Sequence, residues 1–352
     1  MNPASRDRVL AAIRHQTPDR LPVDAICIEN VPDIARELRA APEDVPDLLG
    51  IDGRIVAAPC TVPVTYGPVG EPLTEWLSSA VNDYGTTHRF PLANATTVAE
   101  VERYPWPSPN WYDYDTAAIV ASDLATRYAV RGPYWKPIFC QASSLFGLEH
   151  GLECMLNLPQ VFEAALEYIT EHTLGYCERL LDACGEDLCI LCLGDDFATQ
   201  RGLMMNPAHW RRLLKPRYAR IFQLAKDRGK PVWFHSCGDV TAVLPDLIEI
   251  GADVWETVQL HTLPMSPVEL KREYGRDITF FGGVNTQHLP FASPAEVREE
   301  TLRCIEALGA DGGYICGPDH HIKPDVPAAN VVALFEAART FRREGYTAAA
   351  RS

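Results

Sequence analysis

The stretch PVWFHSCGDVTAVLPDLIEIGADVWETV, residues 231–258, contains the pattern that decides the fold. A short apolar run at Pro231–His235 precedes a helix-like segment, and a second short run follows at Asp253–Val258. A strand, a helix and a strand in this order predict two parallel strands joined by a crossover helix. The same alternation continues toward both ends of the chain.

Working outward, we predict further strands of the same kind. With no sign of a second core, they favour the α/β class and a closed (β/α)8 TIM barrel over an open sheet. A barrel of this length forms one unit, so residues 1–352 are predicted to be a single domain. The predicted strands are Leu21–Ala25, Arg54–Ala58, Tyr128–Gly132, Leu188–Leu193, Pro231–His235, Asp253–Val258, Ile278–Gly282 and Gly313–Cys316.

Residues 59–127 interrupt the alternation. NDYGTTHRF, residues 82–90, predicts a hairpin, and YPWPSPNWYDYD, residues 104–115, is rich in proline and aromatic residues. One interpretation is an irregular helical and hairpin insertion that covers one end of the barrel. The other is a lid whose aromatic side chains, Trp106, Trp111 and Tyr112, face a substrate.

Composition excludes several classes of protein. Hydrophobic residues make up 47% of the chain and charged residues 22%, which is typical of a globular protein. The net charge of -15 argues against binding to nucleic acid or to an anionic membrane. The N-terminus does not resemble a signal peptide, and no apolar run approaches the ~18 residues of a membrane span. We therefore expect a cytoplasmic protein whose 11 scattered cysteines are reduced.

His235 and Cys237 are candidate metal ligands. His235 falls at the C-terminal end of a predicted strand, where barrel enzymes build their active sites. Residues two apart in an extended chain point to the same side, so both side chains can reach one ion. Imidazole nitrogen and thiolate sulfur are ligands that Zn²⁺ prefers. Two ligands do not make a site, and an incidental pair is the alternative.

The segment GGYICGPDHHIKPDVP, residues 312–327, offers further ligands. Because all strand ends of a barrel meet at one face, the loops after two distant strands can share a cavity. His235, Cys237 and Cys316 would leave a fourth position open, as in catalytic zinc sites. His320 could replace Cys316 or complete the set. Alternatively, Cys316 is a buried apolar residue and His320 a loop residue bonded to backbone.

Polar residues near other strand ends are candidates for catalysis. Glu256 lies on a predicted buried strand and is a fourth ligand, a general base or a member of a salt bridge at the barrel rim. Asp195 and Asp196 are adjacent, so they point to opposite sides. Either could orient a histidine ligand, contact substrate, or cap a helix. Asn285 could donate a hydrogen bond to substrate.

Three stretches of the chain resemble the uroporphyrinogen decarboxylase superfamily. They are SRDRVLAAIRHQTPDRLPVD (5–24), HSCGDVTAVLPDLIEIGAD (235–253) and GGYICGPDHHIKPDVPAANVVALFEAAR (312–339). The similarity spans nearly the whole chain in the right order and implies a (β/α)8 barrel. True decarboxylases of this superfamily carry an arginine-rich motif after the first strand and lack the H-x-C pair. DAICIENVPDIARELRA, residues 24–40, does not carry that motif, which argues against decarboxylation of a tetrapyrrole.

The chain is more similar to the cobalamin-dependent methyltransferase branch. That branch has H-x-C followed by a distant cysteine, all bound to zinc, and His235 and Cys237 match the pair directly. Aligning IKPDVP places His320 at the position of the distant cysteine and Cys316 four residues early. Glu256 lies near the position of the carboxylate ligand of the family, and Gln259 is the alternative at that position.

This resemblance implies a zinc-dependent methyltransferase that moves a methyl group between a small donor and a corrinoid (cobalamin) supplied by a partner protein. The stretch 82–107 is similar to methyl-ether-cleaving members, which favours O-demethylation; in the reverse direction a thiol would accept the methyl group. Asp196 and Glu256 would orient ligands or move a proton. Two other hypotheses are a metal-independent decarboxylase and a non-enzymatic protein that binds a corrinoid or tetrapyrrole. A homodimer remains open.

Overall fold

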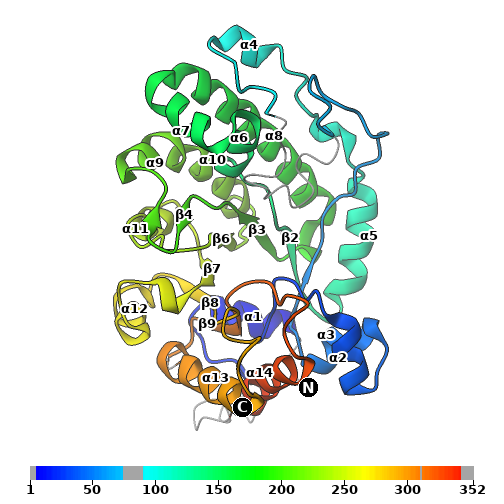
Figure 1. Ribbon diagram of the computed structural model, residues 1–352. Helices are drawn as coiled ribbons and strands as arrows, with labels where there is room; N and C mark the ends of the chain where they lie inside the picture. The colour runs from blue at the N-terminus through cyan, green and yellow to red at the C-terminus, as the bar shows by residue number, and fades with distance from the viewer. Residues whose placement is uncertain (1–4, 74–89, 310, 342–352) are drawn as a thin grey trace.

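A parallel sheet lies at the centre of the computed structural model, which describes residues 5–73, 90–309 and 311–341 (Figure 1). Seven strands form it in the order β1-β2-β3-β6-β7-β8-β9, and β4 and β5 form a separate antiparallel pair. The strands are β1 (Gly53–Ile55), β2 (Ala129–Pro133), β3 (Ile190–Gly194), β4 (Ala198–Thr199), β5 (Gly202–Leu203), β6 (Val232–His235), β7 (Val254–Val258), β8 (Thr279–Val284) and β9 (Tyr314–Pro318).

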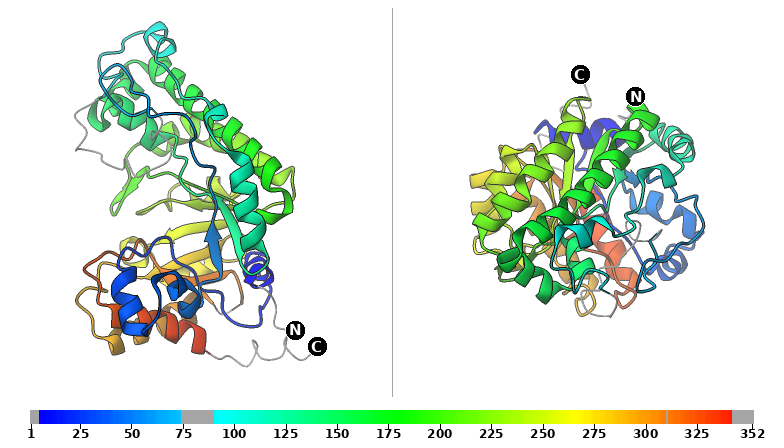
Figure 2. Two further views of the ribbon diagram at one scale, coloured as in Figure 1. Left: turned by 90° about the vertical axis from the view of Figure 1, so that its right-hand side faces the viewer. Right: turned by 90° about the horizontal axis from the view of Figure 1, so that it is seen from above.

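The helices lie around the curled sheet, as the view from above in Figure 2 shows. They are α1 (Ser5–Ile13), α2 (Val31–Leu38), α3 (Val45–Leu49), α4 (Val98–Glu102), α5 (Tyr114–Ala125), α6 (Phe139–Phe146), α7 (Leu148–Asn157), α8 (Pro159–Cys184), α9 (Pro207–Leu213), α10 (Lys215–Lys226), α11 (Leu244–Glu249), α12 (Pro267–Tyr274), α13 (Pro294–Leu308) and α14 (Ala328–Thr340). None of these described helices is both long and apolar enough to cross a membrane.

Local sequence fixes where several of the helices begin. Both α12 and α13 start with a serine N-cap and a proline in the first turn. Ser266 and Glu269 form a capping box, as do Ser293 and Glu296, so the first backbone N–H groups of each helix have acceptors. These helices cross over between consecutive parallel strands, as the sequence predicts.

The strands β2, β3 and β6 to β9 are buried on both faces, and alternate side chains enter two different hydrophobic clusters. Trp233 and Val254 belong to the cluster inside the curl, whereas Phe234 and Trp255 belong to the cluster between the sheet and the helices. Residue parity along each strand therefore decides which side chains can reach the interior.

The predicted strand Leu21–Ala25 is the exception among the predicted strands. Only Val23 pairs, as an isolated parallel bridge with Cys316. The backbone N–H of Val23 donates to the carboxylate of Asp52 at 3.0 Å instead of continuing a ladder, and Pro22 has no N–H to donate. The segment still joins the two edge strands, because Asp24 N–H donates to Cys316 O of β9, and the N–H of Asp52, which precedes β1, donates to Val23 O. The seven other predicted strands are confirmed in position.

The aromatic residues of the 59–127 segment pack on α8. The ring of Trp106 stacks on Tyr168 with centroids 4.8 Å apart, and Tyr112 meets Tyr176 edge-on at 4.8 Å. Both α4 and α5 contact the same helix (Figure 2). Trp106 and Tyr112 therefore contribute to the core around α8, and the lid interpretation of these two side chains is not supported. The predicted hairpin at 82–90 lies almost wholly outside the described residues.

Candidate metal centre

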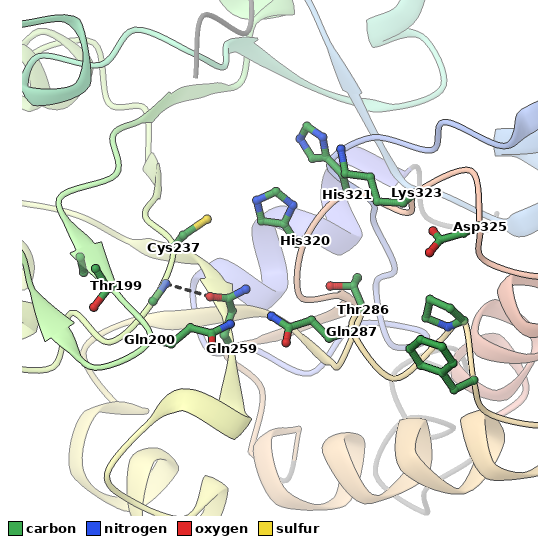
Figure 3. A pocket seen from close by; sticks show the side chains of 14 residues that line it. Thr199, Gln200, Cys237, Gln259, Thr286, Gln287, His320, His321, Lys323 and Asp325 are labelled. Carbon is green, nitrogen blue, oxygen red and sulfur yellow. Dashed lines mark hydrogen bonds between the residues drawn. The ribbon is translucent and has the colours of Figure 1, made fainter. Parts of the chain in front are cut away.

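Three side chains converge at the C-terminal end of the sheet. His235 ends β6, Cys237 follows it on the loop, and His320 lies just beyond β9. One ligand atom from each lies within 4.8 Å of the other two, and Cys237 Sγ is 3.4 Å from His235 Nε2. In Figure 3, Cys237 and His320 are directed into the same cavity. The structure thus brings together two predicted ligands and the alternative third ligand.

The geometry of this group fits a zinc ion. Zinc–sulfur and zinc–nitrogen bonds of about 2.3 and 2.0–2.1 Å, arranged tetrahedrally, place neighbouring ligand atoms about 3.5 Å apart. The 3.4 Å between Cys237 Sγ and His235 Nε2 matches that value. The limit of 4.8 Å for the whole set requires only a small closure of side chains. Two imidazoles and one thiol also leave room for a fourth ligand.

Glu256 orients His235. The two residues are paired between β6 and β7, and both side chains point inward. Glu256 Oε1 lies 2.8 Å from His235 Nδ1, and Oε2 accepts a hydrogen bond from Trp233. A carboxylate at Nδ1 holds a proton on that nitrogen, so Nε2 is the nitrogen that faces the cavity and would bind a metal ion there. This contact makes Glu256 a positioning residue for His235.

The electrostatics of the centre favour a cation. Burial acts to raise the pKa of Glu256, but the hydrogen bond from His235 and the charges of His235 and Arg131 hold that pKa below its usual range. For His235, burial is outweighed by Cys237 and Glu256, which raise the pKa. Burial and the charge of His235 lower the pKa of His320 to about 4. His320 is therefore neutral near pH 7 and able to bind a metal ion.

A buried ion pair between Arg131 and Asp24 lies next to Glu256 and Trp233. The side chain of Arg131 is 1% exposed and donates to the carboxylate of Asp24. Its guanidinium carbon lies 4.7 Å from the ring centroid of Trp233, which in turn donates to Glu256. The interior of the curl thus holds a connected polar chain under the metal centre instead of a purely apolar core.

Asp195 and Asp196 point to opposite sides. Asp196 Oδ1 lies 3.6 Å from His235 Nε2 and accepts the backbone N–H of Cys237 at 2.9 Å, so it holds the Cys237 loop against the centre. Asp195 is fully buried on the other side. It accepts the N–H groups of Phe139 and Cys140 at the start of α6. Asp195 is therefore a helix cap.

Cys316 and Asn285 lie apart from the metal centre. Cys316 shares the outer face of β9 with Tyr314, and it packs between the sheet and the helices. Burial raises its pKa to about 12, so it stays a neutral thiol. Asn285 Oδ1 accepts the N–H of Gln287 at 2.9 Å and shapes the loop after β8. Neither side chain reaches the group formed by the other predicted residues.

A cavity of about 490 Å³ opens beside Cys237 and His320. Its lining includes three glutamines, and Gln259 Oε1 accepts the N–H of Gly238 at 2.9 Å (Figure 3). Gly238 has φ +77°, and a Cβ there would lie 2.4 Å from Thr199 O, so only glycine fits this turn. The fixed oxygen of Gln259 leaves its amide N–H groups for a ligand. The glutamines are Gln200, Gln259 and Gln287.

This chain is similar in sequence to a known protein family. Residues 87–341 match the family model described as uroporphyrinogen decarboxylase (URO-D). The chain belongs to the uroporphyrinogen decarboxylase family. The family predicted from the sequence motifs is therefore confirmed.

Curated proteins that are similar to this chain include a methyltransferase and two uroporphyrinogen decarboxylases. The chain is 23% identical over 197 residues to the methylcobamide:CoM methyltransferase MtaA of Methanosarcina barkeri, covering 56% of this chain and 54% of that protein. It is 29% identical over 132 residues to a uroporphyrinogen decarboxylase of Thermus thermophilus, covering 38% and 37%. The matched stretches thus span about half or less of these curated relatives.

A solved structure shares the fold of this URO-D family chain. A methyltransferase from Methanosarcina mazei superposes with a TM-score of 0.65 at 20% identity, covering 95% of this chain and 98% of that one. Together with the curled parallel sheet, this supports a TIM-barrel-like fold.

Two residues of the centre have no counterpart among the predicted site residues. Tyr134 and Trp135 follow β2, and their ring centroids lie 6.0 and 5.5 Å from that of His235. The available signal was their place just after the predicted strand Tyr128–Gly132, because residues at C-terminal strand ends of a barrel face the active site.

Proposed function

We propose that this protein is a zinc-dependent methyltransferase that moves a methyl group between a small methyl ether and a corrinoid held by a separate protein. The observation that carries the proposal is the convergence of His235, Cys237 and His320 at the C-terminal end of the sheet. Similarity to MtaA of M. barkeri supports methyl transfer involving a corrinoid. The proposal takes residues 1–352 as one barrel domain, with 59–127 as an insertion in it.

Each residue of the centre has a task in this reaction. His235, Cys237 and His320 would hold the metal, and Cys316 is left out of the set. A zinc ion supplies Lewis acidity to the heteroatom of the donor, or lowers the pKa of a thiol acceptor in the reverse direction. Glu256 keeps Nε2 of His235 turned to the cavity, and Asp196 fixes the loop that carries Cys237.

The open side of the cavity suits a reaction with a partner protein. A cavity of about 490 Å³ lies in the usual size range of small-molecule sites. Its exposed rim leaves an approach for the partner corrinoid, and docking there would exclude water from the transferred methyl group.

Metal content and methyl transfer from methoxybenzene to Co(I) cobalamin test the proposal together. We expect about one zinc per chain, and we expect His320→Ala to lose both zinc and methyl transfer. Cys316→Ala is the matched control, since that thiol faces the helices, and it should keep both. A metal-free His320→Ala protein that transfers methyl groups at the wild-type rate would contradict the proposal.

A second candidate function is metal-independent decarboxylation, which the match to the Thermus decarboxylase favours. It predicts purified protein without stoichiometric metal and release of carbon dioxide from an acidic substrate. The segment 24–40 argues against it, because it does not carry the arginine-rich motif of tetrapyrrole decarboxylases. Elemental analysis of the purified protein separates the two functions.

A further inference from the structure

Two aromatic side chains pack edge-on against His235, one of the candidate metal ligands. Tyr134 and Trp135 make interplanar angles of 75° and 84° with the imidazole of His235. Both remain partly exposed, although the residues of β2 before them are buried. Tyr134 also packs on the cluster inside the curl. Both residues follow β2 at the C-terminal end of the sheet, so the two rings lie beside His235 there.

The backbone of Tyr134 adopts a conformation that bulky residues rarely take. Its φ is +85°, in the left-handed region that favours glycine. Its N–H still donates to Cys192 O at 2.8 Å, which extends the contact between β2 and β3 by one residue. Such strained positions persist where the surroundings enforce them, and they concentrate at ligand sites. A tyrosine kept in this conformation therefore suggests that its ring is needed at this place.

The indole ring of Trp135 packs against Gly194, the last residue of β3. Gly194 ends β3, and a Cβ on it would lie 2.7 Å from two ring atoms of Trp135 and 3.0 Å from Cβ of His235. Gly194 is not among the glycines with positive φ, so its backbone would accept another residue. Glycine at this position thus serves to make room for the indole against His235.

The cavity beside Cys237 and His320 has a different chemistry. Its described lining includes three glutamines and two threonines, together with Lys323 and Asp325. Among the described residues that line it, the aromatic one is Phe291, which is 85% exposed. The rings of Tyr134 and Trp135 thus form an aromatic wall beside His235, whereas amide and hydroxyl groups lie beside Cys237 and His320.

We propose that Tyr134 and Trp135 are specificity-determining residues that hold the planar ring of an aromatic methyl donor beside the metal centre. This inference rests on the proposed function and names the donor class that the same site takes. Aromatic rings pack on one another edge-to-face or offset, and this preference adds to the burial of apolar area. The ring of an aromatic methyl ether can pack against Tyr134 and Trp135, which strengthens its binding. An aliphatic methyl ether has no ring to make this contact, so its affinity gains little from the two side chains. The amide groups of the glutamines that line the cavity can form hydrogen bonds with polar substituents of the ring.

Binding to the zinc-loaded full-length protein tests this inference without relying on turnover. Calorimetry would compare methoxybenzene with methoxyethane for the wild type, Trp135→Leu and Gly194→Ala. We expect Trp135→Leu to weaken methoxybenzene binding by about tenfold and to leave methoxyethane within about twofold. Gly194→Ala keeps the indole but displaces it, so it should weaken methoxybenzene in the same selective way. Retained zinc content shows that each variant is folded.

Trp106→Leu is the matched control, because Trp106 stacks on Tyr168 of α8 away from the metal centre. It should bind methoxybenzene as the wild type does. Equal affinity of the wild type and Trp135→Leu for methoxybenzene would overturn the inference, as would an equal loss for methoxyethane. Absence of zinc from the wild type would refute the proposed function instead, and ring binding by the metal-free protein would still decide the role of Trp135.

Discussion

At the scale of single residues, Glu256 decides which nitrogen of His235 faces the cavity. We predict that Glu256→Gln lowers zinc affinity about 10- to 100-fold, because an amide holds the Nδ1 proton less strongly and no longer adds negative charge. Competition with a chelator of known affinity measures the change. The substitution keeps the shape of the side chain, so loss of fold is not the expected cause.

Glu300→Gln provides the matched control. Glu300 Oε2 lies 3.0 Å from His288 Nδ1, a carboxylate–histidine pair like that of Glu256 but away from the metal centre. Its substitution should leave zinc affinity unchanged. If both variants lost zinc equally, the effect would reflect general loss of charge or stability, and the orienting role of Glu256 would be rejected.

Sequence predicted part of this site for a physical reason. The two-residue spacing of His235 and Cys237 fixes a common side, and the strand end fixes the location. The choice between Cys316 and His320 could not be made, because YICGP is apolar throughout and does not reveal which parity faces inward. The left-handed backbone of Tyr134 could not be predicted, since nothing in its residue type signals that conformation.

At the scale of elements, strands were predictable wherever both faces of the sheet are covered. Such strands have short, mainly apolar sequences, and seven of the predicted strands coincide with observed ones. Leu21–Ala25 has the same kind of sequence, but the carboxylate of Asp52 takes the N–H of Val23. Asp52 is 29 residues away from Val23 in the sequence, so a local sequence pattern does not predict this hydrogen bond.

The two aspartate caps of α5 and α6 allow a prediction at the same scale. Asp195→Ala should lower the free energy of unfolding by roughly 3–5 kcal/mol, because it leaves buried N–H groups of α6 and the hydroxyl of Tyr218 without their acceptor. Asp113→Ala removes the exposed cap of α5, which accepts Thr116 N–H at 2.9 Å, and should cost only about 1 kcal/mol. Urea unfolding of both variants measures the difference. Similar costs would show that burial does not amplify the cap of α6.

At the scale of the whole molecule, the 59–127 segment and α8 are joined through aromatic and polar contacts. Tyr112 of that segment meets the rings of His172 and Tyr176 on α8, and Lys136 lies 4.1 Å from the Tyr176 centroid. His172 is 5% exposed, and neither ring nitrogen has a hydrogen-bond partner among the described residues. A charge on this histidine would have no compensation in the contact, which makes the contact sensitive to acid.

Stability should therefore fall in acid through His172. Burial, with a contribution from the charge of Lys136, lowers the pKa of His172 to about 3. Between pH 6.5 and 3 the unfolded chain binds a proton that the folded protein rejects, so this stabilisation is complete above pH 6.5 and is lost as the pH falls. From pH 6.5 to 4.5 the loss is about 2–3 kcal/mol.

His172→Phe keeps the ring but removes the titration, so its free energy of unfolding, measured in urea, should decline less steeply than that of the wild type. At pH 7.5 His172 is neutral in both states, which gives the reference for the comparison. Parallel declines of the two proteins between pH 6.5 and 4.5 would show that protonation of His172 does not control the contact between α8 and the 59–127 segment.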